Sequence, residues 1–254
     1  MFSKITTAIL TIMVFTGSPA SAQDSKPVQN TNPLTGQEVL RLSDEKLIPG
    51  LCSYVLRMDT VRKGKKPKIN GFIGYKKGAK KNVLIVKRPK RVAGSVYLKK
   101  DNVIWSYYTT NHRLTKVAYQ AVFMGTLLNY GDILATELSS DYDVAKLEEV
   151  SDKYMLTLTT REGKSGYGTI VLTVDKDTFL PEKRSYYALS GILMKECRFE
   201  KISYQDGMLS YLEMHFIEPM KERKTIVRFT DIRPQKNIPD KYYNESYIKF
   251  LGGE

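Results

Sequence analysis

The sequence is poor in the side chains that bind metals and carry out most nucleophilic catalysis. Its 254 residues include only two histidines, His112 and His215, and two cysteines, Cys52 and Cys197. Zinc sites need close groups of such residues, and these four are widely spaced in the chain. We therefore predict no metal site and no cofactor.

Sequence motifs of catalysis are also missing. The chain has no G-x-S-x-G turn, no H-E-x-x-H helix and no P-loop. His112 lies in a polar turn and His215 alternates within an apolar strand pattern, so both are interpreted as structural residues. We predict that the protein is not an enzyme. A hydrolase built on an unfamiliar β fold remains the rival interpretation.

The one long apolar run, residues 8–15, is too short to cross a bilayer, which needs about 20 residues. Lys4 precedes it, and small residues ending at Ala22 follow it. This pattern predicts a secretory signal peptide, residues 1–22, cleaved after Ala22, and export to the periplasm of a two-membrane bacterium. An uncleaved anchor is the alternative. Residues 23–35 are polar with two prolines and predict a flexible leader, followed by one domain, residues 36–254.

Acidic residues are outnumbered, with 27 Asp and Glu against 40 Lys and Arg, a formal net charge of +13. A basic exported protein has few nucleic-acid partners, so we expect none, and anionic membranes or acidic proteins fit better. A solvated basic surface is the alternative. Six lysines in basic turns are predicted to dock a membrane or partner if they share one rim: Lys63, Lys65, Lys66, Lys77, Lys80 and Lys81. We expect a monomer.

The two cysteines leave two alternatives open. In an oxidising compartment Cys52 and Cys197 could pair and close a long loop. Nothing in the sequence indicates that their Cα atoms approach closely enough for a disulfide. Two unpaired, buried thiols are the other alternative.

Strand patterns dominate the rest of the chain. Thr35 and Glu38 have the spacing of a capping box, which predicts a helix over 36–47. Tight polar turns then separate short alternating segments, which predicts about 11–12 strands in one curved antiparallel sheet. The expected strands are 53–61, 69–75, 82–87, 95–99, 102–108, 113–121, 153–160, 167–174, 183–189, 193–204, 209–218 and 224–231. Further helical turns are expected around 130–138 and 143–150, and a short helix or strand over 239–251.

The order of several short motifs is informative. These are Cys52-Ser-Tyr-Val-Leu-Arg-Met58, the hairpin 93–107, Val122-Phe-Met-Gly125 before Tyr130-Gly-Asp132, and Phe229-Thr-Asp-Ile-Arg-Pro234. In this order the chain resembles the outer-membrane lipoprotein-sorting protein family, the LolA-like periplasmic carriers. It departs from that pattern at Thr126-Leu-Leu, where the family has a Ser-Asp-Phe segment.

The resemblance implies a mainly β, half-open (incomplete) β-barrel whose mouth is covered by two or three short lid helices. The cavity would bind the acyl chains of lipoproteins or another lipid and carry them toward the outer membrane. The implied partners are an inner-membrane transporter and an outer-membrane acceptor. Two alternatives share the fold: an accessory lipid-binding subunit of a membrane lipid exporter, and a lipoprotein-sensing regulatory protein.

Candidate site residues follow from alternation within this fold. Arg57 is a candidate contact to the lid, although a solvated outer position is equally compatible. Because the sequence does not fix strand register, errors at alternate positions are expected, and a packed-core role is the alternative for each cavity candidate. The lipid-cavity candidates are Tyr54, Leu56, Met58, Val83, Ile85, Trp105, Tyr107, Tyr154, Leu156, Ile170 and Leu172.

Overall fold

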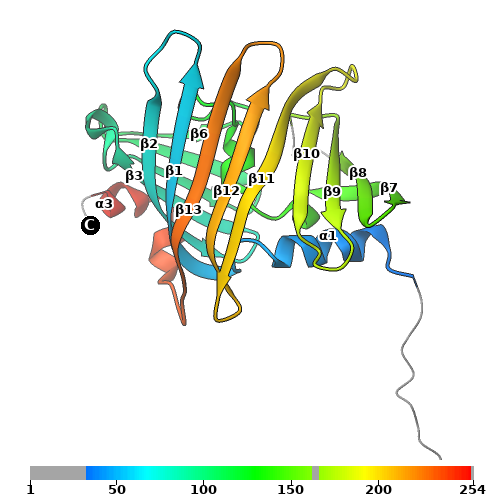
Figure 1. Cartoon of the computed structure of the whole chain (residues 1–254). Helices are drawn as coiled ribbons and strands as arrows, with labels where there is room; N and C mark the ends of the chain where they lie inside the picture. Colours follow the sequence, from blue (N-terminus) through cyan, green and yellow to red (C-terminus); the bar gives the residue numbers. More distant parts are fainter. Residues whose placement is uncertain (1–32, 162–165, 253–254) are drawn as a thin grey trace, which may run out of the picture. The chain divides into compact units, whose positions relative to one another are not determined.

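The computed structural model describes residues 33–161 and 166–252, and these contain thirteen strands in one antiparallel sheet (Figure 1). The predicted signal peptide, 1–22, and most of the predicted leader lie outside the described residues. The strands are β1 (Leu51–Arg62), β2 (Lys68–Lys77), β3 (Lys81–Arg88), β4 (Val96–Lys100), β5 (Val103–Tyr108), β6 (Arg113–Val117), β7 (Tyr142–Val150), β8 (Lys153–Thr160), β9 (Thr169–Asp175), β10 (Pro181–Tyr187), β11 (Leu193–Gln205), β12 (Met208–Glu218) and β13 (Arg223–Pro234).

The first and last strands pair in the middle of the sheet. The order is β6-β5-β4-β3-β2-β1-β13-β12-β11-β10-β9-β8-β7. Apart from β1 and β13, all strands that pair with each other are consecutive in the sequence. The hydroxyls of Thr60 and Thr225, 165 residues apart, lie 3.0 Å from each other across the β1–β13 junction. The sheet therefore consists of two meanders joined along one central seam.

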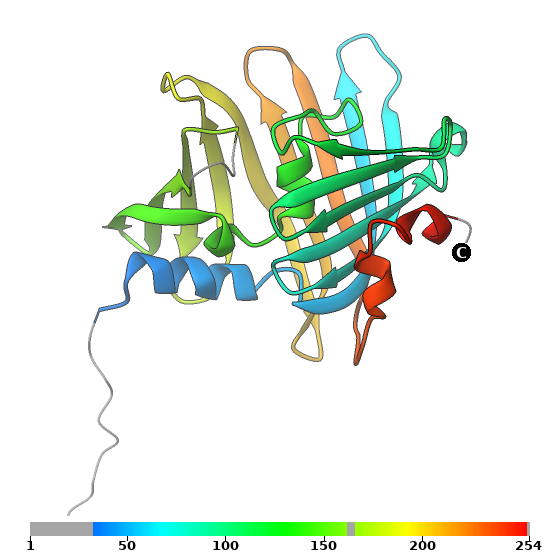
Figure 2. The same cartoon turned by 180° about the vertical axis from the view of Figure 1, so that it is seen from behind.

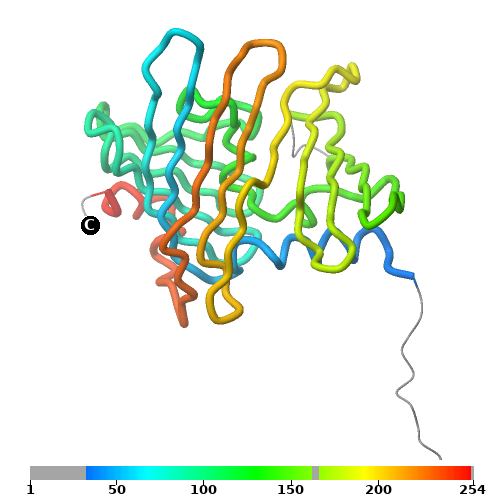
Figure 3. Tube along the Cα trace, in the orientation of Figure 1, coloured from blue at the N-terminus to red at the C-terminus, as the bar shows by residue number. Residues whose placement is uncertain are grey.

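The two edge strands, β6 and β7, are consecutive in the chain and are not paired with each other, so the sheet is not closed into a barrel. The segment between them must cross from one edge to the other. It carries helix α2 (Tyr130–Leu134) and the 3-10 turn η2 (Leu138–Ser140). The trace in Figure 3 follows this crossing, and Figure 2 shows α2 between the two halves of the curled sheet.

A third element lies over the same side of the sheet as α2 and η2. Helix α1 (Gly36–Glu45) begins at the predicted capping box, in which Thr35 and Glu38 exchange hydrogen bonds. It buries Val39 and Leu40 completely and packs beside η2, β7 and β8. We call α1, α2 and η2 the lid, and the sheet face that they cover the lid face.

The opposite side of β3, β4 and β5 has a separate cover. The 3-10 turn η3 (Asp240–Tyr243) and helix α3 (Ile248–Leu251) bury Ile238, Tyr243, Ile248 and Leu251 against these strands. We call residues 238–251 the tail, and the face that they cover the tail face. Because both faces of β3 are covered, five consecutive residues of this strand, 82–86, are buried.

The expected mainly β fold, with one curved antiparallel sheet left open and short helices, is confirmed. One element differs. Residues 143–150, expected as a helical turn, belong to strand β7, which raises the strand count to thirteen in the described part of the chain. Most β7 side chains are exposed, so the apolar alternation that identifies a strand is too sparse there. Residues 239–251, expected as a short helix or strand, contain two short helical elements, η3 and α3, separated by a turn.

Both cysteines are buried and free. The strand register pairs Cys197 with Phe216, Phe216 with Thr225, and Thr225 with Thr60. Cys197 thus lies three strands away from β1, roughly 14 Å, and level with a residue eight positions from Cys52. This separation excludes a disulfide in this fold. Burial raises the pKa of the Cys52 thiol to about 11 and that of Cys197 to about 12.

Among the helices in the described residues, none has the length and apolar character that a bilayer crossing needs.

Candidate functional site

A buried ion pair joins the lid to the sheet. Lys195 Nζ of β11 lies 2.5 Å from the Oδ2 atom of Asp132 in α2, and the two side chains are only 6% and 5% exposed. Lys195 also donates a hydrogen bond to the carbonyl of Leu127 at 3.2 Å. A buried charge needs a partner, so this contact fixes α2 against β11 only while both charges are present.

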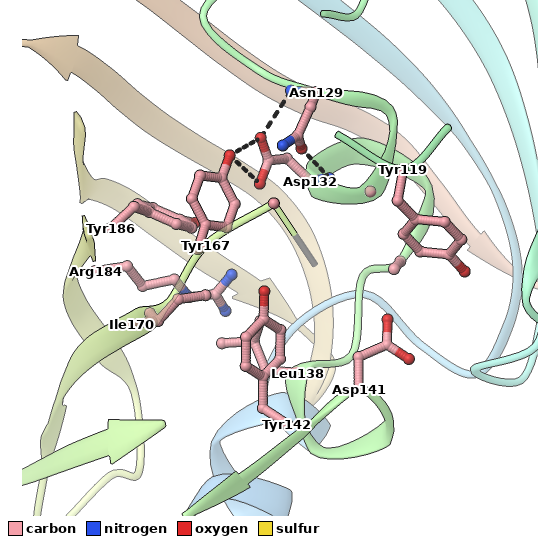
Figure 4. Close-up of a pocket in the computed structure, with 13 residues that line it drawn as sticks. Tyr119, Asn129, Asp132, Leu138, Asp141, Tyr142, Tyr167, Ile170, Arg184 and Tyr186 are labelled. Carbon is pink, nitrogen blue, oxygen red and sulfur yellow. Dashed lines mark hydrogen bonds between the residues drawn. The ribbon is translucent and has the colours of Figure 1, made fainter. Parts of the chain in front are cut away.

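The Asp132 carboxylate is oriented by its own helix. Asn129 caps α2 by accepting a hydrogen bond from the Asp132 N–H, and Asp132 accepts one from the Asn129 N–H at 2.8 Å. The Tyr167 hydroxyl donates to the same carboxylate at 2.9 Å (Figure 4). Burial, and then the charge of Asp132, raises the pKa of Tyr167, which therefore stays a neutral donor.

Aromatic rings surround the cation of this pair. Lys195 Nζ lies 4.9 Å from the ring centroid of Tyr167, 4.8 Å from that of Tyr186 and 5.6 Å from that of Phe216. The faces of these rings attract an ammonium group and keep water from it. The ion pair is therefore shielded in the closed lid.

Two pockets adjoin each other beside the Lys195–Asp132 pair. One is a cavity of about 30 Å³ beneath the lid, and the other is an open groove of about 310 Å³ between residues 120–129 and the ends of β11, β12 and β13. Asn129, Gly166 and Tyr167 line both. The cavity has room for about two water molecules, whereas the groove has the size of a small ligand pocket. The ion pair thus lies between two adjoining pockets, of which the one beneath the lid is the smaller.

A second basic residue lies inside the cavity. Arg184 of β10 is 9% exposed, and its Nε and Nη2 atoms have no hydrogen-bond partner among the described residues. Its guanidinium lies 5.0 Å from the ring centroid of Phe199. In Figure 4 the guanidinium points into the space that Tyr142 also faces, below the contacts of Asp132.

Asp44 of α1 is the lid carboxylate that acts electrostatically on Arg184. It accepts a hydrogen bond from the Ser139 N–H at 2.7 Å, and no ion pair joins it to Arg184 in the part of the chain that the structure describes. Burial raises the pKa of Asp44, and the Ser139 N–H and the Arg184 charge oppose this effect only in part.

Further polar contacts hold the lid at its other end. Lys76 of β2 donates to the Ile48 carbonyl at 2.8 Å and lies 2.8 Å from a carboxylate oxygen of Glu137. The Asn82 amide of β3 donates to the Leu134 carbonyl at 3.2 Å. The lid is therefore held to the sheet by buried polar side chains as well as by apolar packing.

The predicted cavity residues divide between the two faces. Tyr54, Leu56, Met58, Leu156, Ile170 and Leu172 lie in the lid-face core, and Tyr154 packs against it. Within this set, only Ile170 lines the small cavity. Val83, Ile85, Trp105 and Tyr107 lie on the tail face instead.

The physical reason is that the tail buries the second face of β3, β4 and β5. Alternation cannot tell the two faces apart when both are buried. The residues of these strands that reach the lid-face core are Leu84, Val86, Tyr97 and Ile104. Trp105 packs beside Lys116, whose Nζ lies 5.0 Å from the centre of its ring.

Arg57 does not contact the lid. It points to the exposed side of β1 and donates hydrogen bonds to Asp59 at 3.0 and 3.1 Å. Its neighbours Leu56 and Met58 are buried on the lid face, and a strand alternates its side chains, so Arg57 must lie on the opposite side. Basic residues that do reach the lid segment from the sheet include Lys195 and Lys76.

The six predicted docking lysines do not share one rim. Lys63, Lys65 and Lys66 lie in the β1–β2 turn, at the upper end of the sheet in Figure 1. Lys77, Lys80 and Lys81 lie at the β2–β3 turn, at the opposite end of β2. Lys77 and Lys81 are 3.0 and 3.2 Å from Asp240 of the tail, so their charge is used within the molecule.

The two residues of the ion pair were not predicted from the sequence, and Ile170 is the one predicted candidate that lines the small cavity. Two signals were present. Asn129 and Asp132 have capping-box spacing, and Arg184 and Lys195 share strand parity with the buried Tyr186 and Cys197. A basic residue on an apolar strand face indicates a buried charge that needs a partner. No group of three metal-ligating side chains occurs within residues 33–161 and 166–252.

Comparison with known proteins supports the fold assignment. A LolA superfamily protein from Nitrosomonas europaea has a TM-score of 0.76 at 20% identity, covering 85% of this chain and 100% of its own. A DUF1329 family protein from Desulfovibrio piger has a TM-score of 0.72 at 23% identity, with coverages of 84% and 97%. An outer membrane lipoprotein-sorting protein domain from Vibrio parahaemolyticus has a TM-score of 0.69 at 20% identity, with coverages of 84% and 98%.

No curated protein matches the sequence. A family model described as "Uncharacterized protein" matches residues 78–249, which is more than half of the chain. That range runs from the end of β2 to α3 and so includes the lid segment, Arg184, Lys195 and the tail. The chain therefore belongs to this family, and its fold is the LolA-like fold of the outer-membrane lipoprotein-sorting proteins.

Proposed function

We propose that this protein is a non-enzymatic lipid carrier of the periplasm. It binds the acyl chains of lipoproteins, or of another lipid, beneath the lid and moves them toward the outer membrane. The observation that carries the proposal is the shielded Lys195–Asp132 pair, which holds α2 of the lid to β11 between a larger groove and a small cavity. The LolA-like fold supports the same conclusion.

The lid must open for cargo to enter, because a cavity of about 30 Å³ cannot hold an acyl chain. Opening the lid costs free energy because it separates the Lys195–Asp132 pair and exposes apolar side chains of α1 and α2 to water. Burying acyl chain gains about 0.8 kcal/mol per CH₂ group. The free energy gained grows with the length of the buried chain, so a long chain displaces the lid more readily than a short one.

The groove end of the sheet suits contact with a membrane. Leu189 and Met220, at the tips of the β10–β11 and β12–β13 turns, are 94% and 83% exposed. The β1–β2 turn at the same end carries Lys63, Lys65 and Lys66 (Figure 1). Exposed apolar tips beside lysines fit the interface of an anionic phospholipid membrane. In this proposal the donor and acceptor, an inner-membrane transporter and an outer-membrane protein, meet the carrier at that surface.

Native mass spectrometry of the protein purified from a periplasmic extract tests the proposal, with lipid extraction of any adduct. We expect the mass of one bound lipid or acylated protein, and saturable binding of a fluorescent fatty acid. In Asp132→Ala the fatty acid should enter faster, whereas Glu222→Ala, which removes an exposed pair with Lys63, should match the unmodified protein. A protein that carries no lipid and binds no fatty acid would refute the carrier.

A further inference from the structure

Arg184 is a buried cationic side chain whose hydrogen-bond donors are only partly used in this structure. Its Nε and Nη2 atoms are buried, and neither has a hydrogen-bond partner within residues 33–161 and 166–252. Guanidinium stays protonated in proteins, so the unused donors belong to a cation. A buried, incompletely paired cation is costly, and an apolar side chain would fill the same place without that cost.

No carboxylate forms an ion pair with the Arg184 guanidinium in the part of the chain that the structure describes. The Asp132 carboxylate, which lines the same cavity, is engaged by Lys195 and by the Tyr167 hydroxyl. Asp44 acts on Arg184 without forming an ion pair, and burial raises its pKa. Asp141 also lines the cavity and accepts a hydrogen bond from the Ser140 hydroxyl at 3.1 Å.

The cavity next to the guanidinium has room for a small polar group. Its volume of about 30 Å³ corresponds to about two water-sized atoms, which matches the two oxygens of a carboxylate. Apolar walls adjoin it, because Ile170 and Leu138 line the cavity and belong to the lid-face core. A ligand with a carboxylate at one end and a hydrocarbon chain at the other fits both parts.

We propose that Arg184 binds the carboxylate of a single-chain anionic lipid, a fatty-acid type of cargo, in the cavity beneath the lid. This inference rests on the proposed function, because the chain reaches the lid-face core only after the lid has moved. The Nε–H and Nη2–H donors lie on one edge of the guanidinium and are covered in this state, so they match the two oxygens of a carboxylate once the lid has moved. Arg184 thereby favours an anionic cargo, and the apolar core binds the hydrocarbon chain of that cargo.

Isothermal titration calorimetry with decanoate, methyl decanoate and acetate tests this assignment. We expect the protein to bind decanoate at least about tenfold more tightly than its methyl ester, since the ester cannot accept charge-assisted hydrogen bonds in the same way. Acetate should bind far more weakly than decanoate because it lacks the chain. In Arg184→Met the preference for decanoate should disappear while the affinity for the ester is unchanged.

A second variant keeps the assignment testable if Arg184→Met does not fold. Asp44→Asn removes the carboxylate that acts on Arg184, so it should increase the affinity for decanoate and leave that for the ester unchanged. Equal affinity of the unmodified protein for acid and ester would overturn the role of Arg184 and leave the carrier intact. Binding of neither long-chain ligand would overturn the carrier itself. Acetate binding as tight as that of decanoate would overturn a lipid as the ligand.

Discussion

The lid and the tail cover opposite faces of one sheet by different means. The lid brings two buried carboxylates, Asp44 and Asp132, against basic residues of the sheet. The four most deeply buried side chains of the tail are Ile238, Tyr243, Ile248 and Leu251, and none of these is charged. Apolar contacts are lost only by exposing surface, whereas an ion pair can exchange one partner for a ligand or water. Under the proposed function the lid is therefore the cover that moves and the tail is the cover that stays.

Removing the carboxylate of Asp132 from the lid should cause the largest loss of stability. Asp132→Ala leaves Lys195 buried without its carboxylate, and we expect a loss of about 3–5 kcal/mol, measured as faster hydrogen exchange of α2 and lower stability in urea. Glu222→Ala, which breaks an exposed pair, should cost about 0–1 kcal/mol. A loss below 1 kcal/mol for Asp132→Ala would show that water already reaches the pair.

Truncating a buried side chain of the tail should cause the next largest loss of stability. Ile248 is fully buried, so Ile248→Ala should lower the free energy of unfolding by about 2–4 kcal/mol without changing lipid binding. Phe250 is 57% exposed in the same helix, and Phe250→Ala should change stability by less than about 0.5 kcal/mol. If Ile248→Ala altered lipid affinity, the tail would belong to the moving part of the molecule.

The lysines at the two ends of the sheet test which end contacts an anionic membrane. Replacing Lys63, Lys65 and Lys66 with Gln should lower binding to anionic vesicles at least about tenfold, since each lysine near such a surface contributes about 1 kcal/mol and, among the described residues, only Lys63 has a carboxylate partner, Glu222. The same change at Lys77, Lys80 and Lys81 should have little effect, because two of these lysines already face Asp240. Equal losses from both triple variants in a vesicle co-sedimentation assay would argue against docking at the groove end.

The smallest effect concerns pH. Burial raises the pKa of Asp44 above its ordinary value, 3.8, so the folded protein binds this proton more tightly than the unfolded chain. The stabilisation from this group is complete below that value and declines as the pH rises through the folded-state pKa. In Asp44→Asn the free energy of unfolding, followed in urea from pH 4 upward, should decline less. A decline identical to that of the unmodified protein would mean that Asp44 does not titrate in this range.

The same contrast explains what the sequence could predict. Tight polar turns and alternation were sufficient for twelve strands and the capped first helix, since these are local signals. The faces of Val83 and Ile85 could not be assigned, because their burial depends on a tail about 160 residues away in the chain. The Lys195–Asp132 pair brings β11 to α2 over 63 residues, and no local pattern selects that partner.

The central seam between β1 and β13 has a consequence for the order of folding. Because the first and last strands are neighbours there, the two meanders can form separately, but their junction must wait until the final strand is available. Joining residues as far apart as Thr60 and Thr225 carries a large loop-closure entropy, which slows the step that completes the sheet. A chain that has not finished this step leaves the β1 edge of one meander and the β13 edge of the other unpaired, and such edges are sites at which chains aggregate.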